Sequence, residues 1–182
     1  MAVTQSNMIP LGSEASNFTL LDAVSGNRMN LYYLSSNIAT VIMFICNHCS
    51  YVKYIQEHLV KFTRDYTDKK ISFIAINSNN VNEYPEDSLD KMKEVSENFN
   101  FCFPYLFDET QSVAKAYKAS CTPDFFVYDL DLKLVYRGQY DSSRPQNEIP
   151  VSGHDLGKAL DLILENKTLN FEQIPSTGCN IK

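Results

Sequence analysis

The sequence predicts an α/β domain in which a central mixed β-sheet is flanked by helices. Residues 40–46 and 71–77 are near-continuous apolar runs rich in β-branched and aromatic side chains, a pattern typical of parallel strands covered on both faces. Between them, over 49–68, apolar residues recur at spacings of three and four, as on one face of an α-helix. A later pair of strands around a polar turn predicts an antiparallel hairpin, so the sheet is expected to be mixed.

The other elements follow from the same patterns along the chain. An irregular arm is expected at 1–17 and a tail at 166–182, where Pro175 and Gly178 disfavour helix and strand. The elements expected between them are, in order, an N-terminal β-hairpin (18–21 and 29–31), strand 40–46, helix 49–68, strand 71–77, an inserted helix 86–99, a short strand 103–107, helix 109–118, a hairpin (125–128 and 134–137) and helix 155–165.

Length and charge exclude several classes of protein. A chain of 182 residues suits one domain, here 1–182. The formal charge of −6 argues against nucleic-acid partners and against anionic membranes. No apolar stretch approaches the roughly 20 residues of a membrane span, and residues 1–10 lack the features of a signal peptide. We therefore expect a cytoplasmic protein whose thiols are kept reduced.

Cys46 and Cys49 are the residues most suggestive of chemistry. They stand three residues apart, where strand 40–46 ends and helix 49–68 begins. A thiol at a helix N-terminus faces unsatisfied N–H groups and the positive end of the helix dipole, which favour the thiolate. We expect Cys46 to be the attacking thiolate and Cys49, one turn into the helix, to resolve the mixed disulfide. The alternative is that the spacing of the two thiols has no functional meaning.

His48 lies between the two cysteines. An imidazolium beside Cys46 would stabilise its thiolate and the reduced state, and would make the disulfide more oxidising. The alternative is a solvated loop histidine. Metal binding is the main rival use of the thiols, but no second CxxC or HxxxH supplies a four-ligand site. Such a site would need the fold to bring up further residues: Cys102, Cys121, Cys179 and His154.

Several motifs resemble a bacterial thioredoxin-like family of the AhpC/TSA (redoxin, peroxiredoxin-like) branch. They are Phe44-Ile-Cys-Asn-His-Cys-Ser-Tyr-Val-Lys53, Tyr84-Pro-Glu-Asp-Ser88, Cys121-Thr-Pro-Asp-Phe-Phe126, Tyr136-Arg-Gly138 and Pro175-Ser-Thr-Gly-Cys-Asn-Ile-Lys182. The resemblance implies a thioredoxin-like fold with the N-terminal hairpin and the inserted helix. It also implies that Thr122 and Pro123 form a cis-proline loop facing the thiols, where the exposed backbone of Thr122 could pair with a substrate strand.

Two departures from these families limit the function that the resemblance implies. Thioredoxins usually carry Trp before the first cysteine and Pro inside the pair, whereas this chain has Ile45 and Asn47-His48 there. Peroxiredoxins carry a Pro-xxx-Thr-xx-Cys loop, which neither Cys46 nor Cys49 completes. We therefore predict a thiol–disulfide oxidoreductase using Cys46 and Cys49. The alternatives are a low-efficiency, antioxidant thiol peroxidase and a non-enzymatic redox sensor or metal-binding module.

The remaining cysteines and two arginines are weaker candidates. Cys121 or Cys179 could be a third redox thiol, or simply a small apolar residue. For Cys179 we predict a disulfide with Cys46 or Cys121, while Cys102, between two phenylalanines, is expected in the core. Two arginines, Arg137 and Arg144, could steer an anionic substrate, although surface arginines are usually just solvated.

The predicted partners follow from the predicted reaction. A disulfide-containing protein or a small-molecule thiol would be the substrate, and thioredoxin or glutathione would serve as the reducing partner. No cofactor, nucleic acid or membrane is expected, and the chain is predicted to be a monomer or a homodimer. The sequence shows no buried carboxylate that could take the proton of Cys49.

Overall fold

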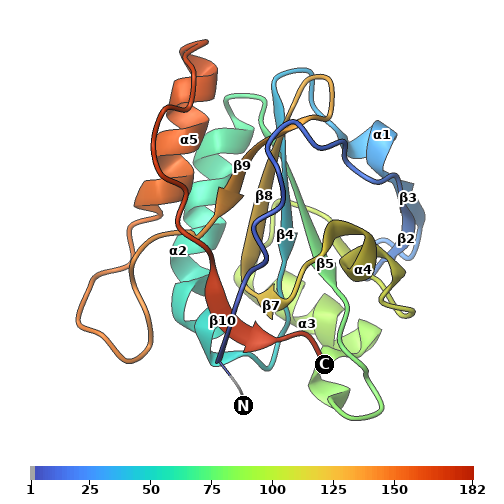
Figure 1. The fold of residues 1–182 in the computed structure, drawn as a ribbon. Helices are drawn as coiled ribbons and strands as arrows, with labels where there is room; N and C mark the ends of the chain where they lie inside the picture. Colours follow the sequence, from blue (N-terminus) through green and yellow to red (C-terminus); the bar gives the residue numbers. More distant parts are fainter. Residues whose placement is uncertain (1–2) are drawn as a thin grey trace.

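The computed structural model describes residues 3–182 and contains two β-sheets flanked by helices (Figure 1). The elements in chain order are β1 (Val3–Gln5), β2 (Thr19–Asp22), β3 (Arg28–Asn30), α1 (Leu31–Leu34), β4 (Ala39–Phe44), α2 (Ser50–Thr67), β5 (Ser72–Asn77), the 3-10 turn η1 (Pro85–Asp87), α3 (Leu89–Phe99), β6 (Tyr105–Phe107), α4 (Ser112–Tyr117), β7 (Cys121–Thr122), β8 (Asp124–Asp129), β9 (Leu134–Gly138), α5 (His154–Leu164) and β10 (Thr177–Asn180).

The main sheet has seven strands in the order β3-β2-β6-β5-β4-β8-β9. Strand β4 pairs parallel to β5, and β5 pairs parallel to β6. Strand β8 is antiparallel to β4, and β9 is antiparallel to β8. All six residues of β4 are buried, as a central strand covered on both faces requires. The predicted α/β class with a central mixed sheet is therefore confirmed.

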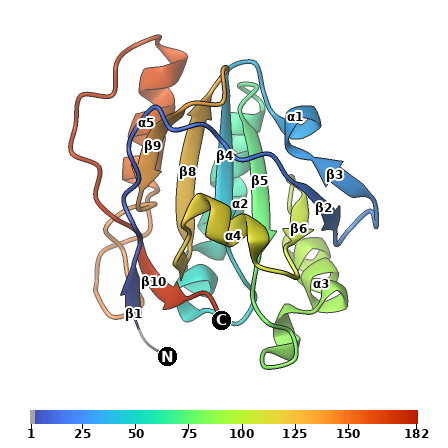
Figure 2. The ribbon, with the colours of Figure 1, turned by 45° about the vertical axis from the view of Figure 1, so that its right-hand side comes forward.

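Helices cover the two faces of this sheet. In Figure 2, α4 crosses in front of the sheet and α2 lies behind it. Alternate residues of β4 follow this division: Val41 and Met43 pack with α2 and α5, while Ile42 and Phe44 pack with α4. Because successive side chains of a strand point to opposite faces, one strand contributes to both cores.

The second sheet joins the two ends of the chain. Strand β10 lies between β1 and β7, antiparallel to both, and Figures 1 and 2 both show it beside β1 near the start of α2. The expectation that 1–17 and 166–182 are irregular is thus wrong at β1 and β10; residues 1–2 of the expected arm lie outside the described residues. A strand partner supplied by a distant segment outweighs the weak local propensity of the tail.

The predicted helices and strands are present with shifted ends, and a few elements were not predicted. Helix α2 begins at Ser50 rather than at residue 49, and the inserted helix begins as η1 before α3. Helix α1 and strand β7 had no sequence signal. Among residues 3–182, no helix combines the length and the apolar character needed to cross a membrane.

Candidate active site

The site forms where the carboxyl ends of β4 and β5 meet the start of β8. Parallel strands end at the same edge of a sheet, so the loops after Phe44 and Asn77 emerge side by side. Strand β8 runs the other way and begins at this edge with Asp124, which pairs with Phe44. The segment before β8, Thr122-Pro123, therefore faces the thiols, as the sequence resemblance implies, and its peptide bond is cis.

The thiols of Cys46 and Cys49 both contact Thr122. The Cys46 Sγ lies 3.3 Å from the Thr122 hydroxyl, and the Cys49 Sγ lies 3.2 Å from the Thr122 carbonyl oxygen. Cys46 is 1 % exposed and Cys49 is fully buried. The chain thus holds two neighbouring thiols against one polar residue and away from solvent.

The electrostatic surroundings of Cys46 and Cys49 differ in direction. Interaction with the Cys46 thiol, and then with Cys179 and Thr122, lowers the pKa of Cys49 to about 5 against the effect of burial. Interaction with Cys49, burial and the charge of Asp87 raise the pKa of Cys46 well above its usual range. These directions run against the expectation that Cys46 is the low-pKa thiol, and that assignment stays a prediction. The helix starts later than expected, and Cys49 is its N-cap, where the helix end favours a thiolate.

His48 faces a carboxylate and an aromatic ring. Its Nδ1 lies 2.5 Å from the Asp87 Oδ2, and its ring stacks on Tyr84 with centroids 4.5 Å apart. The side chain is 7 % exposed, so His48 is not a solvated loop residue. Its Nε2 is buried and has no hydrogen-bond partner within residues 3–182. Stabilisation of a thiolate by His48 stays a prediction.

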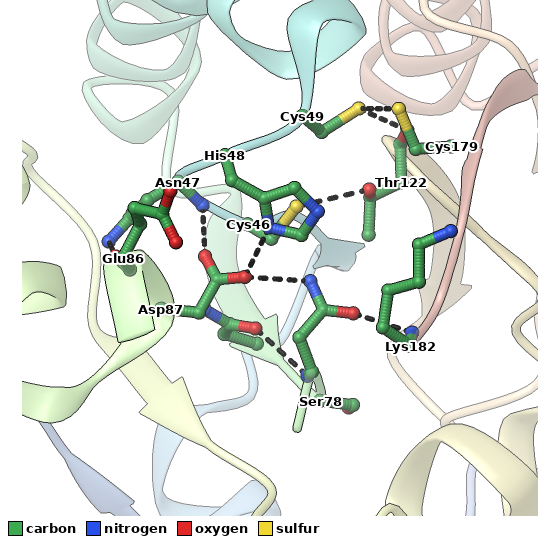
Figure 3. A network of polar contacts seen from close by, with 12 residues as sticks. Cys46, Asn47, His48, Cys49, Ser78, Glu86, Asp87, Thr122, Cys179 and Lys182 are labelled. Atoms are coloured by element: carbon green, nitrogen blue, oxygen red, sulfur yellow. Dashed lines mark hydrogen bonds and ion pairs between the residues drawn. The ribbon is translucent and has the colours of Figure 1, made fainter. Parts of the chain in front are cut away.

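Asp87 is the functional residue that sequence reasoning missed. It is fully buried and accepts hydrogen bonds from the backbone N–H of Asn47 at 2.6 Å and the Asn79 amide at 2.9 Å, besides facing His48 (Figure 3). The sequence showed no buried carboxylate that could take the proton of Cys49. Asp87 is a buried carboxylate at this site, but the thiol beside it is that of Cys46. Its only signal is the Tyr84-Pro85-Glu86-Asp87 run within a family-like motif.

The C-terminal strand covers the site. Cys179 in β10 pairs with Thr122 of β7, and Thr122 is only 2 % exposed. Gly178 permits this approach, because a Cβ there would lie 2.0 Å from the Thr122 carbonyl oxygen. The expectation that the Thr122 backbone is free for a substrate strand is therefore wrong, since β10 already occupies that edge.

The other cysteines occupy three different environments. The Cys179 Sγ lies 2.8 Å from the Cys49 Sγ, so its neighbour is neither of the partners expected for it, Cys46 and Cys121. Burial raises the pKa of the Cys121 thiol, and its Sγ points to backbone oxygens of Pro123 and Ser176 at 3.8 and 3.9 Å. Cys102 is exposed, which corrects its expected place in the core, because it follows α3 at a loop.

Arg137 and Arg144 are engaged within the protein. Arg137 is fully buried and donates to Asp124 at 2.9 Å, so it is not a solvated surface residue. Arg144 donates to the backbone oxygens of Asp141 and Ser143 at 2.7 and 2.6 Å. Both guanidinium groups thus have hydrogen-bond partners within the protein.

One cluster in the described part of the chain has the spacing of a metal site. Ligand atoms of Cys46, His48 and Asp87 all lie within 4.8 Å of one another. The contact between His48 and Asp87 already uses one atom of each, while the buried Nε2 of His48 has no partner among residues 3–182. A fourth ligand, which a structural zinc site needs, is not part of it.

Comparisons with known proteins place the chain in a family. The model of the AhpC/TSA family matches residues 11–137, which include β2 to β8 and most of β9. None of the curated proteins that were compared with the chain matches it.

Two solved structures are similar over essentially the whole chain. An uncharacterized conserved protein from Geobacillus kaustophilus is 54 % identical with a TM-score of 0.98, covering 100 % of this chain and 96 % of that one. A hypothetical protein from Sinorhizobium meliloti 1021 is 46 % identical with a TM-score of 0.95, covering 98 % and 97 %.

A more distant structure identifies the fold. The thioredoxin domain of a thiol-disulfide oxidoreductase from Bacteroides vulgatus is 18 % identical with a TM-score of 0.60, covering 71 % of this chain and 89 % of that one. At this identity the likeness concerns the fold alone. The thioredoxin-like fold expected from the sequence motifs is confirmed.

Proposed function

The chain belongs to the AhpC/TSA family, and we propose that within it the protein is a thiol–disulfide oxidoreductase that works through Cys46 and Cys49. The observation that carries the proposal is the pair of thiols on Thr122 at the start of α2, with the pKa of Cys49 lowered to about 5. At neutral pH such a thiol is largely a thiolate, the nucleophilic form of cysteine. Redox enzymes of this fold, such as the Bacteroides thiol-disulfide oxidoreductase, support the class of reaction.

The proposed reaction has two exchange steps. The Cys49 thiolate attacks one sulfur of a substrate disulfide and releases the other as a thiolate, leaving a mixed disulfide. Cys46 then loses its proton, attacks the Cys49 sulfur and releases the second substrate sulfur. The substrate disulfide becomes two thiols, and Cys46–Cys49 becomes a disulfide, so two electrons pass from the protein to the substrate. The reverse sequence oxidises a substrate dithiol.

Burial of the thiols bears on the substrate. Because Cys46 and Cys49 are 1 % and 0 % exposed, a protein substrate would require β10 to move aside. A small disulfide needs a smaller opening, so oxidised glutathione is the substrate to test first. We propose a reducing cytoplasm as the setting, with glutathione or thioredoxin as the electron donor.

Equilibration of the reduced protein with glutathione redox buffers tests the proposal. Trypsin leaves Cys46 and Cys49 together in the peptide 29–53, so their disulfide is a mass loss of two hydrogens within that peptide. We expect this species in the wild type and in Cys102→Ser, whose exposed thiol lies outside the site. Cys46→Ser and Cys49→Ser cannot form it. A peptide 29–53 that stays fully reduced at oxidising ratios would refute the proposal.

The same protein tests which thiol is the thiolate. The ultraviolet absorbance of the thiolate in the reduced protein should rise as pH increases through about 5, because a lowered pKa leaves the thiol deprotonated above that value. This step should vanish in Cys49→Ser and persist in Cys102→Ser. A step that is lost with Cys46 instead would restore the roles expected from the sequence.

Two alternatives have distinct signatures. Rapid consumption of hydrogen peroxide that depends on one cysteine would favour a thiol peroxidase; we expect it to be slow, because the peroxide-binding loop is absent from the sequence. Stoichiometric zinc binding by the reduced protein, released when the thiols are alkylated, would favour a metal-binding module.

A further inference from the structure

The thiol nearest to Cys49 comes from the far end of the chain. The Sγ atoms of Cys49 and Cys179 lie 2.8 Å apart (Figure 3). Both residues are buried, with Cys179 3 % exposed. The Cys49 Sγ therefore contacts both the Thr122 carbonyl oxygen and the Cys179 thiol.

The segment that carries Cys179 is fixed on both sides of it. Before it, the Ser176 N–H donates to the Ser6 Oγ at 3.0 Å and the Ser176 hydroxyl to the Gly138 carbonyl at 2.7 Å. After it, the Ile181 N–H donates to the Ser120 carbonyl at 3.1 Å and the Lys182 N–H to the Asn79 Oδ1 at 2.7 Å. Asn79 also binds Asp87, so the C-terminus is tied to the hydrogen-bonded network beside the dithiol.

This anchoring changes the competition for Cys49. From sequence distance alone, the thiol three residues away should always pair with Cys49, because a short loop costs least entropy to close. In the folded protein the pairing of β10 already holds Cys179 beside Cys49, so no further loop-closure entropy is lost when the two thiols join. Two groups held in contact react as if at a very high concentration.

We propose that Cys179 is a third redox thiol of this site, which exchanges with Cys49 to form a Cys49–Cys179 disulfide and set Cys46 free. The Cys179 thiol loses its proton and its sulfur attacks the Cys49 sulfur of a Cys46–Cys49 disulfide. The Cys46–Cys49 bond breaks, the Cys49–Cys179 bond forms, and Cys46 leaves as a thiolate that takes up a proton. No oxidant is consumed, since one disulfide is exchanged for another.

The exchange gives the site a second oxidised form. The new bond joins the start of α2 to the strand that covers Thr122, while Cys46 returns to the thiol state. The first disulfide of this sequence rests on the proposed oxidoreductase function. The Cys49–Cys179 bond itself does not, because any thiol oxidant can form it.

Oxidation of Cys46→Ser with diamide isolates the second bond. Trypsin places Cys49 in peptide 29–53 and Cys179 in peptide 168–182, so digestion without reductant should yield these two peptides cross-linked. Alkylation of Cys179 should fall by about tenfold or more on oxidation, as expected for thiols held in contact. The control Cys46→Ser/Cys121→Ser should keep the cross-link, and Cys46→Ser/Cys179→Ser should lose it.

The wild type is measured in parallel so that two failures can be told apart. If it forms Cys46–Cys49 while oxidised Cys46→Ser leaves Cys179 alkylated as in the reduced protein, the third-thiol inference is wrong and the oxidoreductase proposal stands. If Cys179→Ser, in which this exchange cannot occur, forms no Cys46–Cys49 disulfide while oxidised Cys46→Ser gives the Cys49–Cys179 cross-link, the oxidoreductase proposal is wrong and the pairing of Cys179 with Cys49 stands. Replacing Cys179 in the otherwise intact chain should shift the wild-type oxidised population entirely to Cys46–Cys49; an unchanged distribution would also contradict the inference.

Discussion

Two buried carboxylates in this protein have similar surroundings and different positions. Asp87 and Asp124 are both fully buried, and each faces a basic side chain: His48 at 2.5 Å and Arg137 at 2.9 Å. Each base also lies on an aromatic ring. His48 stacks on Tyr84, and the Arg137 guanidinium carbon lies 3.9 Å from the centre of the Phe126 ring.

The remaining contacts of the two pairs differ. Arg137 also donates to the carbonyl oxygens of Tyr117 and Lys118, the end of α4, so this pair joins a helix C-terminus to the sheet. Asp87 instead binds the backbone of Asn47, between the two thiols. A buried acid–base pair thus lies at a helix–sheet contact in one place and beside the two thiols in the other, and the groups around each pair distinguish the two.

Breaking the Asp124–Arg137 pair should have the largest effect on stability. Asp124→Ala leaves the guanidinium of Arg137 buried without a counter-charge, which should cost about 3–5 kcal/mol of unfolding free energy. Urea unfolding followed by circular dichroism measures the loss.

A double variant separates the unpaired charge from lost packing. Asp124→Leu/Arg137→Met removes both charges and keeps most of the volume, so it should recover much of the stability lost in Asp124→Ala. If the double variant is no more stable than Asp124→Ala, the two side chains matter through their shape and backbone contacts rather than their charges.

Breaking the Asp87–His48 pair should affect the reduction potential of the thiols more than the free energy of unfolding. After the interaction with Cys49 and burial, the charge of Asp87 also raises the pKa of Cys46, so Asp87→Asn should lower that pKa and stabilise the reduced form at the alkaline pH where Cys46 ionises. The Cys46–Cys49 reduction potential should then rise on the order of 30 mV, or roughly 1.4 kcal/mol. Equilibration with glutathione measures it, and Asp124→Asn, at the other pair, is the control. A lower potential in Asp87→Asn would contradict this account of the carboxylate.

The two pairs also show what the sequence can predict. The dithiol is a contiguous motif at a strand–helix junction, so local pattern suffices to place it, whereas Thr122-Pro123 was placed opposite the thiols by the family resemblance alone. Asp87 and Cys179 reach the site from other segments, and nothing in their own neighbourhoods indicates burial. Tyr84-Pro85 predicts a turn, but not that the turn folds over Cys46.

Arg137 and the C-terminal strand were mispredicted for related reasons. An arginine in an edge strand has the pattern of a solvated residue, and only a distant acid, Asp124, makes its burial tolerable. Gly178 disfavours a strand locally, yet the same lack of a side chain allows β10 to approach Thr122. Both outcomes depend on partners that local pattern does not reveal.

Removing His48 should shift the reduction potential in the opposite direction to removing the charge of Asp87. His48→Phe keeps a ring on Tyr84 but leaves the Asp87 carboxylate without its imidazole partner. The negative charge then acts more strongly on Cys46 and disfavours the thiolate, so the reduction potential should fall, by less than about 30 mV. The same glutathione titration reads it. Equal shifts in His48→Phe and Asp87→Asn would mean that the pair acts only by holding the loop.

Replacing the aromatic rings that lie against the two bases, Tyr84 and Phe126, should have the smallest effects of these substitutions. Tyr84→Leu removes the stack on His48 at a half-buried loop position, which should cost about 0.5–1.5 kcal/mol. Phe126→Leu removes a ring from the core beneath Arg137, where a cavity adds to the loss. Urea unfolding should therefore rank Phe126→Leu as the more destabilising, while only Tyr84→Leu should alter the reduction potential, because it frees His48 to turn away from Asp87. A potential unchanged in Tyr84→Leu would show that the contact with Asp87 alone orients the imidazole.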